Sequence, residues 1–356
     1  MRIRALVLGL SLTACTTVPL EAPKPRTLLW PMPPELPRYQ YEASLRSVAS
    51  VLLESDSDRF RRMATGASLP IDPILEKPLA VAARGGRVYV ADSVKRRIVV
   101  FDNPRRKVFE FGLRPPGELL KPLGIALDTL GHVYVADASR RQVIVYDSLG
   151  LYQKTIGDKR FLEHPVAVAA NADGSRIYVV DRGSNESINH RIQMFDAGGE
   201  HIGQIGRRGA GDGEFNVPVQ AAVADDGPLF VLDAGNFRVQ VFTTEGLFLR
   251  RFGQAGNGLG QFARPRGLAL DSAGLVYVSD ASFANVQVFD NTGNLLLPLG
   301  ERDLEGGPGR FVLPAGVAVD ETRRVFIVDQ YLRKVEVLRW LDEAQGRALM
   351  KGKPTR

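Results

Sequence analysis

The sequence predicts an all-β protein, a six-bladed β-propeller with four antiparallel strands in each blade. The first observation is a repeat, in which a proline opens six similar units and each unit continues through short apolar runs. The second is the spacing, because the opening prolines of successive units lie 43 to 53 residues apart. A period of this size with several short strands is typical of propellers. The opening prolines are Pro78, Pro122, Pro165, Pro218, Pro265 and Pro314.

The apolar runs within each unit predict short strands. In the second unit they are residues 125–127, 133–136 and 143–146, which are rich in Val, Ile and Tyr and are separated by Asp and Gly turn residues. The apolar residues are nearly continuous and do not alternate with polar ones, which indicates sheets that are covered on both faces. A single blade cannot bury both of its faces alone, so a stable protein requires a complete ring.

An aspartate ends the second apolar run of every unit. An aspartate at the same place in each repeat is typical of a turn that needs a side-chain acceptor for backbone amides. We therefore predict a structural role for this set and not a role in binding a metal. The six residues are Asp92, Asp137, Asp181, Asp233, Asp280 and Asp329.

The sixth unit lacks a fourth strand, because no apolar run ending in glycine follows residues 335–338. Residues 58–66 resemble the fourth strand of the fourth unit, and Gly66 precedes Pro78 by 12 residues, as Gly206 precedes Pro218. We therefore predict that a strand from the N-terminal part of the chain, residues 58–66, closes the ring. Such a closure removes two open sheet edges.

These units resemble NHL repeats over residues 58–340. The resemblance rests on the stretches at 213–218, 260–267 and 309–316, each Gly-x-Phe followed by a proline, and on the Asn-Phe-Arg-Val-Gln-Val-Phe run at 236–242. It implies a six-bladed propeller of a family whose members mostly bind protein, peptide or RNA, with a minority of enzymes on related propellers. The copies depart from the pattern at the insertion 182–190, at Asn285 where Arg238 stands one unit earlier, and at Glu336.

The N-terminus predicts export and lipid anchoring. Residues 1–14 combine a basic start with an apolar stretch that is too short to cross a bilayer, as in a signal peptide. Leu-Thr-Ala-Cys at 12–15 resembles the lipobox of bacterial lipoproteins, in which Cys15 becomes the lipidated first residue; the alternative is an ordinary signal cleaved nearby. The residue after Cys15 is Thr16, whereas an inner-membrane retention signal would have Asp at this position. We therefore expect the anchor to lie in the outer membrane, with the protein facing the periplasm. Cys15 is the only cysteine, so no disulfide is expected.

Residues 15–57 are expected to form a proline-rich tether and N-terminal extension. The proline density favours an extended segment, with Trp30 and Tyr39 as possible docking points on the propeller. Residues 39–53 are compatible with an outer strand followed by a short helix, and the pattern does not decide between strand and helix. Residues 341–356 are expected to form a tail with helix-forming content at 343–345 and 347–350.

Charge predicts a basic face. The formal net charge is +6. On the face that carries the linkers and the turns between second and third strands, Lys and Arg outnumber Asp and Glu, and the opposite face shows the reverse. We predict that this basic face binds an anionic envelope protein, peptide or glycan without catalysis. An exported chain does not fit nucleic-acid binding. The residues named for this face are Lys95, Arg96, Arg140, Arg141, Arg207, Arg208 and Arg333.

Catalytic chemistry has little support in the sequence. No two of the four histidines have the spacing of a zinc site. His132 and His201 are expected on the acidic face and His164 and His190 on the basic one; the latter two, both in the third unit, are the pair considered as a base or ligand acting together. The innermost strands are almost entirely apolar, so we predict no catalytic, cofactor-binding or metal-binding residues. The alternative is a propeller lyase or hydrolase with a metal near the central channel.

Overall fold

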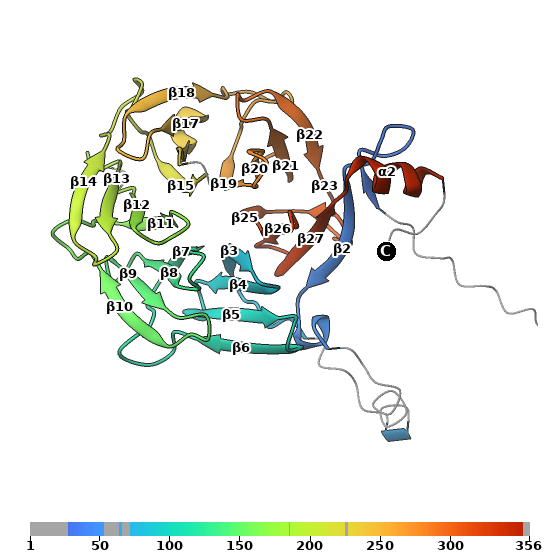
Figure 1. Cartoon of the computed structure of the whole chain (residues 1–356), viewed down its shortest axis with the longest axis horizontal. Helices are drawn as coiled ribbons and strands as arrows, with labels where there is room; N and C mark the ends of the chain where they lie inside the picture. Colours follow the sequence, from blue (N-terminus) through green and yellow to red (C-terminus); the bar gives the residue numbers. More distant parts are fainter. Residues whose placement is uncertain (1–27, 53–63, 66–71, 185, 225–226, 352–356) are drawn as a thin grey trace, which may run out of the picture.

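The computed structural model is a closed ring of six antiparallel sheets around a central channel, the six-bladed β-propeller that the sequence predicts (Figure 1). It describes residues 28–52, 64–65, 72–184, 186–224 and 227–351. Each blade runs from an inner strand at the channel to an outer strand at the circumference, and the first five blades do so in chain order.

The first five blades each hold four consecutive strands. Blade one contains β3 (Pro78–Arg84), β4 (Arg87–Asp92), β5 (Arg97–Asp102) and β6 (Lys107–Phe111), and blade two contains β7 (Pro122–Leu127), β8 (Val133–Asp137), β9 (Gln142–Tyr146) and β10 (Tyr152–Ile156). Blade three contains β11 (Pro165–Ala170), β12 (Arg176–Asp181), β13 (Arg191–Asp196) and β14 (His201–Ile205). Blade four contains β15 (Pro218–Val223), β16 (Leu229–Asp233), β17 (Arg238–Phe242) and β18 (Phe248–Phe252), and blade five contains β19 (Pro265–Leu270), β20 (Val276–Asp280), β21 (Asn285–Phe289) and β22 (Leu295–Leu299).

Blade six is closed by the N-terminal part of the chain, as predicted, but by a different segment. Its strands are β25 (Pro314–Val319), β26 (Val325–Asp329), β27 (Lys334–Trp340) and β2 (Tyr39–Leu45), with β1 (Leu29–Trp30) at the outer edge. The strand β2 pairs with β27 from Tyr39 opposite Trp340 to Leu45 opposite Val335. The prediction that residues 58–66 close the ring is therefore wrong, because β2 and β1 already follow β27 in this sheet; most of residues 58–66 lie outside the described residues.

The closing strand is selected by side chains that fit between two sheets. Tyr39 and Leu45 are both almost fully buried, whereas the charged Glu42 between them is exposed. The hydroxyl groups of Tyr39 and Tyr277 lie 2.8 Å apart, which joins the closing strand to blade five. Residues 39–45 are therefore part of the propeller and not of a tether, which settles the question between strand and helix; a 3-10 turn, Val48–Ser50, follows.

The second strands of the blades form the core because each lies between two neighbouring sheets. All five residues of β8, β16, β20 and β26 are buried. The outer strands instead alternate exposed and covered positions, as in β18. This gradient explains why the sequence shows continuous apolar runs in the middle of each unit and mixed runs at its end.

One large apolar side chain anchors each linker between blades. It stands three residues before the opening proline and is 0–1% exposed in all six units: Leu75, Leu119, Leu162, Phe215, Phe262 and Phe311. The glycine that ends the preceding blade makes room for it. At Gly253, which has a φ of +90°, an added Cβ would lie 2.4 Å from the Phe262 ring. The closing glycine of the repeat is thus required by backbone conformation and by packing together.

The six aspartates that end the second strands all accept hydrogen bonds from linker amides, and four of them also accept from amides of the turn that follows, which confirms the structural role predicted from the sequence. Asp137 accepts hydrogen bonds from the linker amides of Leu120 (2.6 Å) and Lys121 (3.0 Å), and from the turn amides of Ser139 and Arg140 (both 3.0 Å). One carboxylate therefore ties the linker to the turn between second and third strands. These two sets of loops consequently lie on one face of the disc.

The C-terminal tail forms a short helix, α2 (Glu343–Met350), as its composition predicts. Asp342 caps it by accepting a hydrogen bond from the amide of Gln345 at 2.8 Å. An added Cβ at Gly346 would lie 2.6 Å from the Pro37 carbonyl, so the helix packs closely on the N-terminal extension. Among the described residues, no helix has the length and apolar character needed to cross a bilayer.

Candidate functional site

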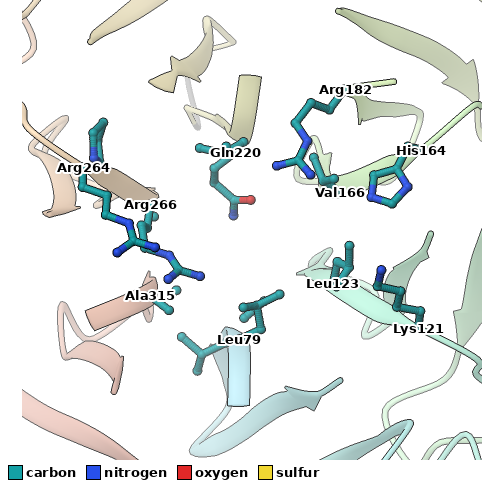
Figure 2. A pocket seen from close by; sticks show the side chains of 16 residues that line it. Leu79, Lys121, Leu123, His164, Val166, Arg182, Gln220, Arg264, Arg266 and Ala315 are labelled. Atoms are coloured by element: carbon teal, nitrogen blue, oxygen red, sulfur yellow. The ribbon is translucent and has the colours of Figure 1, made fainter. Parts of the chain in front are cut away.

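A cavity of about 450 Å³ opens at the end of the central channel on the face of the linkers (Figure 2). Its residues come from the starts of the inner strands and from the linker residues directly before them, except for Arg182, which follows β12. Four cationic side chains and one histidine line it, and no acidic residue does: Lys121, His164, Arg182, Arg264 and Arg266. Its size is within the range of small-ligand sites.

The polar residues of this cavity are departures from the repeat. The residue after each opening proline faces the channel, and it is apolar in five blades (Leu79, Leu123, Val166, Val219 and Ala315) but is Arg266 in blade five. The next position is Ala or Gly in five blades and Gln220 in blade four. The residue after the strand-ending aspartate is Arg182 in blade three and uncharged in the other blades.

The fold does not require Arg182, Gln220 or Arg266, because the equivalent positions in the other blades hold apolar, small or uncharged residues. Gly124 shows what the fold favours at the position of Gln220, since a Cβ there would lie 2.5 Å from the Ala167 backbone of the next blade. Three independent departures that meet at one cavity therefore indicate a function for it. A comparison of equivalent positions across the six units of the sequence would have revealed these three departures. Describing the inner strands as apolar overall conceals them.

The cationic side chains have no counter-charge of their own. Among the described residues, neither an ion pair nor a side-chain hydrogen bond engages Arg182, Arg264, Arg266 or Lys121, although Arg182 and Arg266 are partly buried. Burial lowers the pKa of the Arg182 guanidinium, and burial followed by the charge of Arg264 lowers the pKa of Arg266. Removing unpaired charges from water costs free energy, and a bound anion would offset this cost.

His164 responds to the same environment. Burial lowers the pKa of its imidazole, and the neighbouring Arg182 and Lys121 lower it further. The neutral imidazole is thus favoured in this environment. A bound anion would oppose the second effect, because it screens the cationic charges that disfavour the imidazolium.

A side groove of about 410 Å³ leads away from this cavity between blades two and three. It shares Lys121, His164 and Arg182 with the cavity and adds Arg141 and Glu163. Glu163 accepts hydrogen bonds from the Ser187 hydroxyl (2.6 Å) and the Asn189 amide (2.9 Å), which keep the pKa of its carboxyl low. This carboxylate therefore holds the insertion 182–190 in place.

The seven basic residues named from the sequence lie around the rim, and the structure does not bring them together. Arg141 alone of the seven lines the side groove, and none lines the channel cavity. Three are paired with carboxylates: Arg140 with Glu118 (3.4 Å), Arg207 with Glu214 (2.9 Å) and Arg333 with Glu76 (3.2 Å). Arg208 donates to the Ser187 carbonyl at 3.0 Å, and Lys95 lines a separate pocket beside Glu76 and Glu110, with Arg96 next to it in the chain.

His190 is not part of the candidate site. It is 1% exposed, and its Nδ1 accepts a hydrogen bond from the Val217 amide at 3.1 Å. In the other five blades the strand-ending aspartate accepts a hydrogen bond from the equivalent linker amide, so His190 replaces that acceptor in blade four. The structure thus separates His190 from His164. Within the ranges that the structure describes, no three His, Cys, Asp or Glu side chains gather as a metal site would require.

No family model matches the chain, and no curated protein matches it by sequence. Solved structures do share its fold. A protein of unknown function from Bacteroides thetaiotaomicron has a TM-score of 0.59 at 17% identity, covering 76% of this chain and 70% of that one. A gluconolactonase from Xanthomonas campestris has a TM-score of 0.56 at 19% identity, covering 75% and 87%. A streptogramin B lyase has a TM-score of 0.54 at 13% identity, covering 77% and 96%.

The class that fold and site define is a six-bladed β-propeller with a basic cavity at one end of its channel. Identities this low establish the shared fold alone. The names of these proteins span two enzymes and one protein of unknown function, so the activity of this chain is argued from its own cavity.

Proposed function

We propose that this protein is a non-catalytic binding scaffold of the cell envelope that holds an anionic protein, peptide or glycan on its basic face. The observation that carries the proposal is the set of cations at the channel cavity, whose lining contains no acidic residue. Arginine and lysine placed in this way give both attraction at long range and hydrogen bonds on contact. Arg140, Arg207 and Arg333 on the rim are already paired with carboxylates, so the proposal assigns binding to the cavity and not to them.

The cavity supports binding more than it supports hydrolysis or elimination at a metal. Its lining offers one imidazole and no carboxylate, whereas a catalytic metal is usually held by three protein ligands. The cations of the lining would also repel a metal ion. The lyase and lactonase names among the structural neighbours belong to those proteins, and the residues present here favour the scaffold.

Anchoring through Cys15 is part of the same proposal. Cys15 lies outside the described residues, and its support is the signal-like sequence at 1–14 with the Leu-Thr-Ala-Cys motif. Metabolic labelling with a radioactive fatty acid should mark the full-length protein and leave Cys15→Ala unmarked. Equal labelling of the two chains, or recovery of the intact protein from the soluble fraction, would contradict anchoring.

The scaffold proposal is tested by crosslinking in intact cells followed by mass spectrometry. The test protein carries Arg182→Gln, Arg264→Gln and Arg266→Gln together, and the matched control carries Arg207→Gln and Arg208→Gln on the rim. We expect the triple variant to lose the partners that the natural chain and the rim variant retain. The same partners, crosslinked equally well to the triple variant, would refute the proposal.

A further inference from the structure

The cationic residues of the channel cavity form two groups on opposite walls (Figure 2). The first group is Arg264 and Arg266, which belong to the linker and inner strand of blade five. The second is Lys121, His164 and Arg182, from blades two and three. In a ring of six, blades two and five stand opposite each other, so the ring itself separates the two groups.

The space between the two groups is neutral and largely apolar. Leu79 and Ala315 line one side of the opening, and Val166, Leu123 and Val219 line others. Gln220 projects into the opening between the two groups, where its carboxamide can donate or accept a hydrogen bond (Figure 2). The cavity thus alternates in character across its width, from cationic through apolar to cationic.

From this arrangement we infer that the channel cavity binds an organic dianion, a molecule or chain end with two carboxylate-like groups joined by a short apolar body. The inference deepens the scaffold proposal and rests on it, because it names the chemistry of the element that the scaffold would hold. One anionic group meets Arg264 and Arg266, and the other meets Arg182 and Lys121. The apolar body crosses the opening against Leu79 and Ala315.

A single anion would leave half of the site unsatisfied. Guanidinium groups bind carboxylates with two parallel hydrogen bonds, and such bonds are roughly twice as strong as neutral ones. An anion on one wall cannot form them with the arginine on the other. The partly buried arginine that remains would keep its desolvation cost, so two anionic groups are needed to remove it on both sides.

The chemistry fits two sources, a free dicarboxylate and the end of a peptide whose last residue is acidic. A C-terminal glutamate carries its side-chain and terminal carboxylates on one short carbon chain, as glutarate does. The side groove toward Arg141 gives the rest of a peptide a path out of the cavity, since the groove shares Lys121 and Arg182 with it. Both sources use the same two cationic walls.

The experiment is calorimetric titration of the purified protein with two series of ligands. The first series pairs each dicarboxylate from succinate to suberate with the monocarboxylate of the same length. The second is an octapeptide with a C-terminal glutamate, as free acid and as C-terminal amide. We expect each tested dicarboxylate near the best length to bind at least about tenfold tighter than its monocarboxylate. If the free-acid peptide binds more tightly than the best dicarboxylate, the natural ligand is the end of a protein. If the dicarboxylate binds more tightly, the natural ligand is a small molecule.

Variants separate the two walls from a general effect of charge. Arg266→Gln and Arg182→Gln, one on each wall, should each reduce dicarboxylate affinity to that of a monocarboxylate, whereas Arg207→Gln, which alters an exposed pair with Glu214, should leave it unchanged. In the empty protein, Arg266→Gln should not lower the Tm, because it removes a desolvated and unpaired charge. A lowered Tm would indicate a structural role and overturn the assignment of Arg266 to the ligand.

Three results would overturn the inference. They are equal affinity for dicarboxylates and monocarboxylates, loss of affinity in Arg207→Gln as large as in Arg266→Gln, and failure of both ligand series to bind. If neither series binds but the triple glutamine variant still loses its crosslinked partners, the dianion inference fails and the scaffold stands. If dicarboxylates bind as expected and the crosslinked partners are unchanged, the scaffold fails and the cavity serves a small molecule.

Discussion

Replacing Tyr39 tests whether β2 closes the ring. The side chain is 1% exposed, and its ring meets Tyr277 edge-on with centroids 6.4 Å apart. Tyr277 donates its own hydroxyl to Asp271 at 3.0 Å, so Tyr39 is the donor in the hydroxyl pair. Burial raises the pKa of Tyr39 to about 12, which keeps this donor protonated under ordinary conditions.

The magnitude follows from what each substitution removes. Tyr39→Phe loses one hydrogen bond and leaves Tyr277 bonded to Asp271, so the free energy of unfolding should fall by about 0.5–1.5 kcal/mol. Tyr39→Ala also opens a cavity between blades five and six, which should cost about 3–5 kcal/mol. For a chain of this size, with an unfolding entropy of about 2.1 cal/mol/K per residue, the larger loss corresponds to a fall in Tm of about 4–7 °C.

The assay is thermal and urea unfolding monitored by circular dichroism, with Tyr331→Ala as the matched control. Tyr331 is 63% exposed, so its removal should change the free energy of unfolding by less than about 0.5 kcal/mol. If Tyr39→Ala and Tyr331→Ala have the same Tm, the closing strand does not hold the ring together and the assignment of β2 is refuted.

Three further substitutions test the packing, the turn acceptors and the basic cavity. Gly253→Ala should destabilise the protein by about 2 kcal/mol or more in urea unfolding, because of its positive φ and its contact with Phe262. Asp233→Ala should cost about 3–5 kcal/mol in the same assay, because it leaves the guanidinium of Arg238 buried without its partner. When the pH is lowered from 7 to 5, the Tm of His164→Gln should fall by less than the Tm of the natural chain. The folded pKa of His164 lies below its ordinary value of 6.5, so the stability that its neutral form provides above pH 6.5 is lost as the pH falls through the folded pKa.

Matched controls distinguish these effects from the loss of any glycine or aspartate. Gly213 also has a positive φ, +77°, but an added Cβ meets nothing within 4 Å, so Gly213→Ala should cost clearly less than Gly253→Ala. Asp212 forms an exposed pair with Arg251 at 2.9 Å, and Asp212→Ala should cost less than about 1 kcal/mol. Equal losses within either pair of variants would contradict the packing or turn argument. If the Tm values of His164→Gln and of the natural chain fall equally between pH 7 and pH 5, the burial and cationic neighbours of His164 do not lower its pKa as argued.

Local sequence was sufficient for the blades because each blade is built from residues close together in the chain. The turn from Asp137 to its neighbours and the anchor at Phe262 each occur within one unit, and repetition makes them visible. The ring closure was not visible in this way. A strand that pairs across about 300 residues is selected by its fit between two sheets, and the glycine spacing that favoured residues 58–66 says nothing about that fit.

The candidate site also depends partly on the local sequence and partly on the closed ring. The sequence contains Arg182, Gln220 and Arg266 as departures from its repeat, and it correctly predicts a face that carries the linkers together with the turns. Only the closed ring decides that these three positions, from blades three, four and five, point into one cavity, and that Lys121 and Arg264 face each other across it. The physical reason is that distances between blades are set by packing around the whole circle, whereas the structure of a blade is set by its own turns and strands.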